Sequence, residues 1–309
     1  MLVCDFHCDL PYKVLKCNET LRSDSTHWSL KKLKNDNYIQ FFASYVDKFE
    51  TDNPYLYIDK MLDKFISLVD DCEDIEIITN KETFVNTIEQ NKVGAFLTIE
   101  GGEALGGNID NLDYFYQKGV RLLTLTWNYP NELGEGVGIY NTNKGLTDFG
   151  KNVVLKMADL KMIVDVSHLT ERGFYDVCET TDKPFCATHS NSYSVCKSRR
   201  NLKDEQIDEL IKRKGLLGIN MYPLFLNGTE NASISDVVKH IEYVMSLGGE
   251  DTLCLGCDFD GIDVTPKRIS GINDIENLFE FLLKINYSEK IIAKIAGENL
   301  KNYILSNVF

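Results

Sequence analysis

Three of the five histidines in this chain stand in short polar clusters that could bind a metal ion. His7 precedes Asp9 by two residues, and His168 and His189 each follow a hydroxyl residue at the end of an apolar run. Glu100 ends another apolar run. Imidazole and carboxylate ligands together favour Zn²⁺, with Mn²⁺ or Co²⁺ as alternatives. Because one tetrahedral zinc ion cannot take five protein ligands, this set predicts two divalent metal ions bridged by one carboxylate, with zinc as the favoured metal.

The spacing of His7 and Asp9 indicates that both side chains reach the same ion. Residues two apart on an extended chain point to the same side. The other two histidines, His27 and His240, lie in an expected surface loop and an expected helix. We therefore assign them no part in the metal site.

Eight apolar runs carry these clusters and predict eight β-strands. They span Leu2–His7, Ile39–Val46, Val93–Glu100, Val120–Trp127, Met162–His168, Phe185–His189, Leu216–Tyr222 and Thr252–Asp258. Nearly continuous apolar runs are typical of parallel strands that are covered on both faces.

Amphipathic segments between the runs predict helices. The clearest are Thr147–Leu160, Leu202–Lys214 with Gly215 as its left-handed C-terminal residue, Ser235–Leu247, Ile275–Ile285 and Glu289–Ala296. Alternating strands and helices indicate parallel βαβ units. Eight such units in 309 residues predict a single-domain (β/α)8 barrel over residues 1–309, with a doubly wound open sheet as the alternative. In such a barrel the active site lies at the C-terminal ends of the strands, where the candidate ligands fall.

The charge of the chain excludes some classes of partner. The formal net charge is −14, which disfavours nucleic acid and anionic membranes because both require a basic surface. We see no signal peptide and no run of ~20 apolar residues that could span a membrane. The nine cysteines are odd in number and irregularly spaced, as expected of reduced thiols. A cytoplasmic location is therefore expected.

The polar clusters resemble, in order, those of the membrane dipeptidases, also called renal dipeptidases, a family of amidohydrolase-like barrels. The matching segments are Asp5–Pro11 (D-x-H-x-D-L-P), Glu100–Gly102 (E-G-G), Asp165–His168 (D-x-S-H), Thr188–Ser190 with Arg199–Asn201 (S-H-S…R-N), Gly256–Gly261 (G-x-D-F-D-G) and Gly297–Asn299 (G-x-N). One such motif is a weak signal, but six in order across nearly the whole chain are specific.

The resemblance implies a zinc-dependent dipeptidase with a (β/α)8 barrel of the metal-dependent hydrolase type. His7, Asp9 and Glu100 would hold one zinc ion, and His168, His189 and Glu100 the other. A metal-activated hydroxide would then hydrolyse the amide bond of a short peptide, including dipeptides with a D-residue at the C-terminal position. Dimers are common in the family, so a homodimer is a further expectation.

The resemblance also implies residues that act on the substrate. Asp258 would be the proton shuttle, Arg200 would bind the terminal carboxylate of the substrate, and Tyr222 would line the pocket. Trp127 stands where the mammalian enzymes have a histidine thought to contact the substrate, which leaves the substrate preference open. Asn128 could take over from that histidine.

Two other functions use the same features. Other amidohydrolase-type reactions, such as N-acyl amino acid deacylation or lactone hydrolysis, could employ the same five ligands. A barrel without catalytic activity could bind a peptide or a metal ion for sensing. A panel of dipeptides, N-acyl amino acids and lactones separates these possibilities.

Overall fold

The computed structural model describes residues 1–34, 37–47, 49–140 and 144–309. Its strands are β1 (Val3–Cys8), β2 (Tyr38–Tyr45), β3 (Ile75–Ile77), β4 (Val93–Glu100), β5 (Val120–Thr124), β6 (Ile163–Asp165), β7 (Ala187–Ser190), β8 (Leu217–Ile219) and β9 (Leu253–Leu255). Its helices are α1 (Leu10–Cys17), α2 (Pro54–Asp70), α3 (Lys81–Glu89), α4 (Asp110–Gln117), α5 (Asp148–Asp159), α6 (Glu171–Thr180), α7 (Asp204–Arg213), α8 (Pro223–Leu226), α9 (Ile234–Ser246), α10 (Glu276–Lys284), α11 (Glu289–Ala293) and α12 (Asn299–Asn307). Short 3-10 helices cover Leu30–Lys32, Gly102–Leu105 and Ile272–Asp274, and a π-helical segment (Lys294–Glu298) joins α11 to α12.

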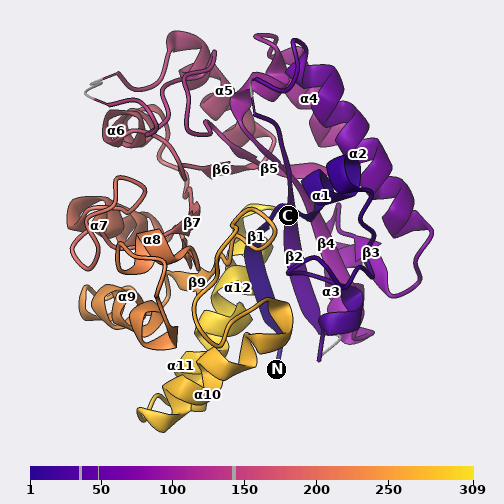
Figure 1. Ribbon diagram of the computed structural model, residues 1–309. Helices are drawn as coiled ribbons and strands as arrows, with labels where there is room; N and C mark the ends of the chain where they lie inside the picture. Colours follow the sequence, from indigo (N-terminus) through magenta and orange to yellow (C-terminus); the bar gives the residue numbers. More distant parts are fainter. Residues whose placement is uncertain (35–36, 48, 141–143) are drawn as a thin grey trace.

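Eight of these strands form a parallel barrel with helices around it (Figure 1). Neighbouring strands follow the order β6-β5-β4-β2-β1-β9-β8-β7. The two ends of this row meet through a parallel bridge between Asp165 and Cys186. There the backbone N–H of Val166 donates to the carbonyl of Cys186 (2.8 Å), and the N–H of Cys186 donates to the carbonyl of Val164 (2.9 Å). The predicted (β/α)8 barrel is confirmed, and the doubly wound open sheet is wrong.

One strand, β3, was not predicted from the sequence. It pairs only with the first part of β4, from Ile75 opposite Val93 to Ile77 opposite Ala95, and lies off the main strand order. Three residues with Glu76 at the centre are too short and too polar to give an apolar run.

Several strands end earlier than predicted, at the side of the barrel where the candidate site lies. The predicted ends at Trp127, His168, Tyr222 and Asp258 lie in turns beyond β5, β6, β8 and β9. His168 and Asp258 adopt positive φ angles of 65° and 62°, which a β-strand does not allow. These polar residues therefore turn away from the strand direction into the mouth of the barrel.

The predicted helices are present, with one change at a helix end. Thr147 caps α5 by accepting a hydrogen bond from the N–H of Gly150 (2.9 Å). The left-handed residue after α7 is Lys214 (φ 58°), so the assignment to Gly215 was wrong. Glycine is still required at 215 because a Cβ there would lie 2.1 Å from the carbonyl oxygen of Phe185.

Apolar packing holds the strands and helices together. Phe41 stacks on Phe96 with ring centroids 4.4 Å apart, and Phe6 meets Phe41 edge to face at 4.8 Å. Helix α12 packs against this cluster, and the Tyr303 hydroxyl donates to the carbonyl of Pro184, just before β7 (3.2 Å). This packing stabilises one end of the barrel. The candidate site lies at the opposite end, where the C-terminal ends of the strands meet.

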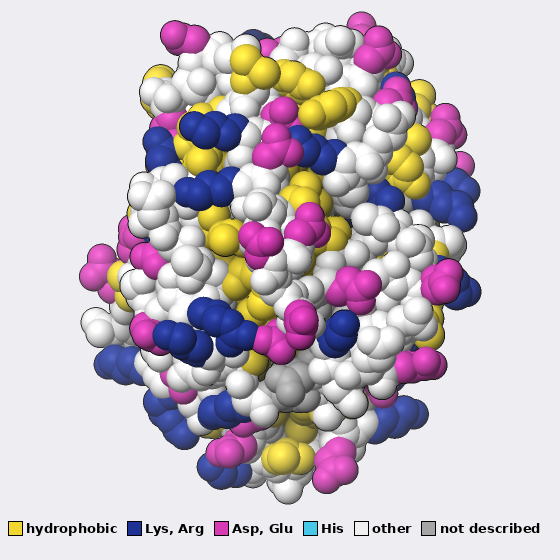
Figure 2. Space-filling model, turned by 90° about the vertical axis from the view of Figure 1, so that its right-hand side faces the viewer, with side chains coloured by type: hydrophobic (Ala, Val, Ile, Leu, Met, Phe, Trp, Pro, Cys, Tyr) yellow, Lys and Arg dark blue, Asp and Glu magenta, His cyan; other side chains and the backbone are white. Residues whose placement is uncertain are grey.

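The surface mixes charges of both signs. On the face in Figure 2, Lys and Arg side chains lie among Asp and Glu side chains, with hydrophobic side chains between them. Among the described helices, none combines the length and the apolar character that a membrane crossing demands.

Candidate active site

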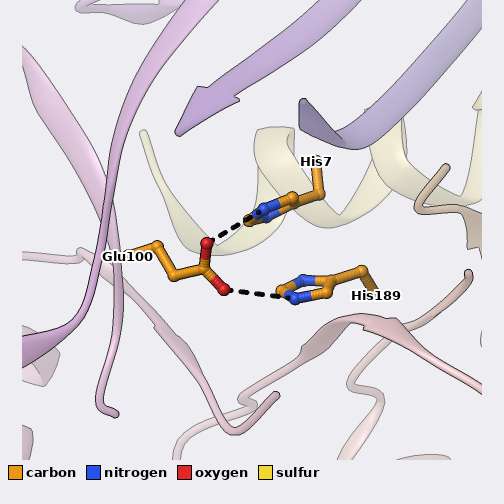
Figure 3. A group of neighbouring side chains, drawn as sticks. All are labelled: His7, Glu100 and His189. Carbon is orange, nitrogen blue, oxygen red and sulfur yellow. Dashed lines mark ion pairs between the residues drawn. The ribbon is translucent and has the colours of Figure 1, made fainter. Parts of the chain in front are cut away.

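The five candidate metal ligands converge on Glu100 at the end of β4. Glu100 Oε2 lies 3.5 Å from His7 Nε2. Glu100 Oε1 lies 3.0 Å from His168 Nε2 and 3.3 Å from His189 Nε2. Figure 3 shows the carboxylate with one oxygen directed to His7 and the other to His189. One buried carboxylate therefore faces two separate groups of side chains.

The first group consists of His7, Asp9 and Glu100. His7 lies in β1, and Asp9 follows that strand, with Asp9 Oδ2 3.3 Å from His7 Nε2. Both ring nitrogens of His7 and the Oδ1 atom of Asp9 are buried without a hydrogen-bond partner among the described residues. Burial opposes a charged imidazole, yet Asp9 and Glu100 raise the pKa of His7 well above its ordinary value. This pocket strongly favours a positive charge.

The second group consists of His168, His189 and Glu100. Burial lowers the pKa of His168 to about 4 and the pKa of His189 well below its ordinary value, so both imidazoles are neutral. Each ring then carries a single N–H, and the hydrogen bonds of the Nδ1 atoms indicate where it is.

In both rings that proton lies on Nδ1. His168 Nδ1 is 2.9 Å from the side-chain oxygen of Asn128, which only accepts. His189 Nδ1 is 2.8 Å from the hydroxyl of Thr188, and this hydroxyl donates its own proton to Asp165 Oδ2 (2.7 Å). Thr188 must therefore accept from His189. The Nε2 atoms of both histidines are left as lone-pair acceptors.

These acceptors face one another in a way that suits a bound cation. The Nε2 atoms of His168 and His189 are 3.0 Å apart, and Glu100 Oε1 completes the triangle. Ligand atoms bound at ~2.0–2.1 Å to a tetrahedral zinc ion are about 3.3 Å apart, close to the distances here. The donor set and its geometry therefore fit a divalent metal ion. The donor atoms of the first group also fit a divalent metal ion. Two further combinations of these side chains lie close enough together to hold an ion: His7 with Glu100 and His189, and His7 with Asp9 and Asp258.

Asp258 faces the first group from the turn after β9. Its Oδ1 atom lies 4.0 Å from His7 Nε2, and its Oδ2 atom accepts a hydrogen bond from the side-chain amide of Asn220 (2.8 Å). Burial raises the pKa of Asp258 to about 7; His7 opposes this shift, while Asp9 and Glu100 add to it. A carboxyl group that titrates near neutrality can both accept and release a proton during turnover. The neighbouring Asp260 instead binds the backbone N–H groups of residues 27 and 28.

Arg200 lies on the other side of the second group. Its guanidinium donates to Ser190 Oγ (3.3 Å) and to the carbonyl of His189 (3.0 Å), and its Nε has no partner among the described residues. It lines a cavity of about 270 Å³, called here the arginine cavity, together with His168. The adjacent Arg199 also lines this cavity, but it is exposed and its guanidinium lies over the ring of Tyr140. Only Arg200 of this pair is both buried and next to the candidate ligands.

Trp127, Asn128 and Tyr222 line a second cavity of about 470 Å³, called here the aromatic cavity. His168 borders both cavities. Trp127 and Tyr222 offer their rings to this space, whereas Asn128 orients His168 through its side-chain oxygen. All the residues assigned to the site from the sequence thus lie in one region, around the same carboxylate.

Three supporting residues were missed from the sequence. Asp165 and Thr188 fix the proton of His189, and Asn220 holds Asp258. Asp165 ends β6 and Asn220 directly follows β8, so their position at a strand end was the available signal, whereas Thr188 lies within β7, directly before His189. The remaining histidine in a helix, His240, is structural: Ser192 N–H donates to its Nδ1 (3.1 Å) and its Nε2 donates to the carbonyl of Leu226 (2.9 Å).

The chain is similar in fold and sequence to solved metallopeptidases. The chain is 25% identical to a metallopeptidase of Rhodobacter sphaeroides whose crystal structure holds a phosphinate mimic of the dipeptide L-Ala-D-Ala, with a TM-score of 0.92 over 100% of this chain and 99% of that one. A crystal structure described as a dipeptidase and metallopeptidase of family M19 is 26% identical, with a TM-score of 0.91 over 99% of both chains.

Two relatives are similar to this chain in sequence. An uncharacterised protein of Klebsiella pneumoniae is 32% identical over 73% of this chain and 86% of its own length. An uncharacterised dipeptidase of Schizosaccharomyces pombe is 34% identical over 68% of this chain and 52% of its own length. The sequence pattern of the membrane dipeptidases matches residues 1–304. The chain therefore belongs to the membrane dipeptidase family, peptidase family M19.

Proposed function

We propose that this metallodipeptidase binds two divalent metal ions, zinc in the first place, and hydrolyses dipeptides, including those with a D-residue at the C-terminal position. The observation that carries the proposal is Glu100, whose two oxygens face two different sets of buried acceptors. His7 and Asp9 would hold one ion with Glu100, and His168 and His189 the other.

When bound, two such ions lower the pKa of water towards ~7 and polarise the carbonyl group of the substrate. Asp258 supplies the proton transfer. Its Oδ2 atom is held by Asn220, so its Oδ1 atom, on the side of His7, accepts the proton of the attacking water and returns it to the leaving amine.

Arg200 selects substrates with a free C-terminus. Its planar guanidinium is buried, keeps its charge and can bind a carboxylate through two hydrogen bonds. Its place beside His168 and His189 puts that carboxylate within one residue of the reacting carbonyl. The bound mimic of L-Ala-D-Ala in the Rhodobacter relative supports a D-residue at this end.

The test combines metal analysis with a substrate panel. Protein supplied with zinc should contain two ions per chain and should cleave dipeptides faster than N-acyl amino acids or lactones, with activity lost to a chelator and restored by metal. Glu100→Gln should lose both ions. Glu103→Gln is the matched control, because Glu103 is a nearby carboxylate that binds Asn131 instead (2.8 Å). Cleavage of lactones or N-acyl amino acids without cleavage of dipeptides would refute the proposed substrate class.

A further inference from the structure

Three half-buried aromatic rings form one side of the aromatic cavity. The ring centroids of Tyr12 and Tyr45 are 5.6 Å apart, and those of Tyr45 and Trp127 are 4.9 Å apart. All three residues line the cavity, and Trp127 lies 6.2 Å from the ring of His168. These three residues, called here the aromatic wall, extend from the candidate metal site towards solvent.

The aromatic wall is held in place by contacts behind it. The Tyr12 hydroxyl donates to Glu50 Oε1 (2.7 Å), and Glu50 also receives a hydrogen bond from Tyr57 (3.2 Å) and an ion pair from Lys16 (3.1 Å). At the other end, Trp127 packs edge to face on Tyr129 at 5.6 Å. A surface fixed before binding loses little conformational entropy when a ligand stacks on it.

The place of Arg200 determines which end of a dipeptide meets the aromatic wall. If Arg200 holds the C-terminal carboxylate, the C-terminal residue occupies the arginine cavity and the reacting carbonyl lies at the ligands. The Arg200 guanidinium also lies over the ring of Phe225, at 5.3 Å, and Phe225 lines the aromatic cavity, so the two cavities adjoin there. The first residue of the substrate is then left with the far part of the aromatic cavity, beside Tyr45 and Trp127.

We propose that the aromatic wall is the binding subsite for the side chain of the first residue, and that it selects large apolar and aromatic side chains at that position. This inference rests on the proposed dipeptidase function. Aromatic side chains stack at ring distances of 4.5–7 Å, and burying a side chain of this size is a large part of the binding free energy of a dipeptide.

Charge at this end of the cavity does not provide a competing preference. Asp9 and Glu100 point to His7, Asp258 accepts a hydrogen bond from Asn220, and Asp260 is bound to the backbone of residues 27 and 28. At the rim, Lys13 and Asp263 line the same cavity with opposite charges. A first residue with a charged side chain therefore gains less here than a flat apolar one.

The test compares dipeptides that share a C-terminal alanine. The zinc-loaded protein should cleave Phe-Ala with a kcat/KM about tenfold or more above that for Gly-Ala, and above that for Lys-Ala. Trp127→Ala should lower the Phe-Ala to Gly-Ala ratio about fivefold, and Trp127→Phe should keep most of it. Tyr12→Ala, at the other end of the aromatic wall, should also lower the Phe-Ala to Gly-Ala ratio. If Trp127→Ala does not fold, the Tyr12→Ala protein tests the subsite in its place. Ile139→Ala is the control, because Ile139 lines the arginine cavity and not the aromatic cavity, and it should change both rates together.

A binding measurement supports the kinetics without turnover. The chain has two tryptophans, and of these Trp127 lines the cavity whereas Trp28 is fully buried and does not, so ligand-dependent changes of fluorescence report chiefly on Trp127. A phosphinate dipeptide mimic with a first-residue benzyl group should bind more tightly than the glycine analogue. Equal kcat/KM for Phe-Ala and Gly-Ala, or a preference for Lys-Ala, would overturn this inference alone. Failure to cleave any dipeptide would overturn both it and the proposed function.

Discussion

Replacing Thr188 by valine should weaken the second metal site without touching any metal ligand. The Thr188 hydroxyl accepts the Nδ1 proton of His189 at 2.8 Å and donates to Asp165 at 2.7 Å. Valine has nearly the same shape but no hydroxyl, so it leaves the buried N–H of His189 unpaired. The His189 ring can avoid this unpaired N–H only by moving the proton to Nε2. The proton would then occupy the lone pair with which Nε2 would bind the ion beside Glu100.

The magnitude follows from the burial of His189, which has 0% of its surface exposed. An unpaired buried donor costs about 1–3 kcal/mol, which corresponds to roughly 5- to 150-fold in affinity. Partners that orient a metal-binding histidine typically contribute about 10- to 100-fold. We therefore expect Thr188→Val to lower the affinity of one of the two ions about 10- to 100-fold and to leave the other nearly unchanged.

The assay is a competition between the protein and a chelator of known zinc affinity, followed by the metal content at each chelator concentration. Thr124→Val is the matched control, since the Thr124 hydroxyl donates to the same Asp165 oxygen (2.6 Å) but does not contact a histidine. Thr188→Ser should restore the affinity. If Thr188→Val retained both ions as tightly as the Thr124→Val protein, the assignment of the His189 proton would be wrong.

Three further predictions concern other parts of the molecule. Asp258→Asn should retain both ions but lose at least about 100-fold in kcat, because a general acid–base group contributes about 10²–10⁴ to the rate; unchanged turnover would remove Asp258 from the mechanism. Arg200→Ala should chiefly raise KM for dipeptides, with Arg200→Lys in between, and the steady-state parameters of the three proteins decide this. Burial lowers the pKa of His240 to about 4 in the folded state, against 6.5 in the unfolded chain. The unfolded state thus binds the proton first, and folding stability should fall by up to roughly 3 kcal/mol as the pH drops from about 6.5 to 4. Denaturant unfolding of metal-free protein should show this slope, and His240→Gln should flatten it.

The sequence predicted the barrel and the ligands because both depend on strongly patterned residues. Apolar runs mark the buried strands, and the polar residues that end them can only lie at the mouth of a parallel barrel. His7, Glu100 and His189 were found in this way, and the structure brings both imidazoles within 3.5 Å of the Glu100 carboxylate.

The features of the site that were not predicted depend on contacts between segments that are distant in the chain. The pairing of Thr188 with Asp165, and of Asn220 with Asp258, joins separate strands and leaves no periodic trace. The left-handed turn at His168 could not be read from an apolar run that continues up to it. Likewise, the three rings of the aromatic wall come from three segments, so their stacking required the fold.

The join between β6 and β7 has a consequence for the stability of the whole barrel. The backbone pairing of this seam is one isolated bridge, supported by hydrogen bonds between Thr188 and the Asp165 side chain, whereas β2 and β4 pair over eight residues. His168 follows one strand of the seam and His189 belongs to the other. An ion bound by both would link the two strands across this short backbone pairing, so the metal-free protein should open more readily at this place.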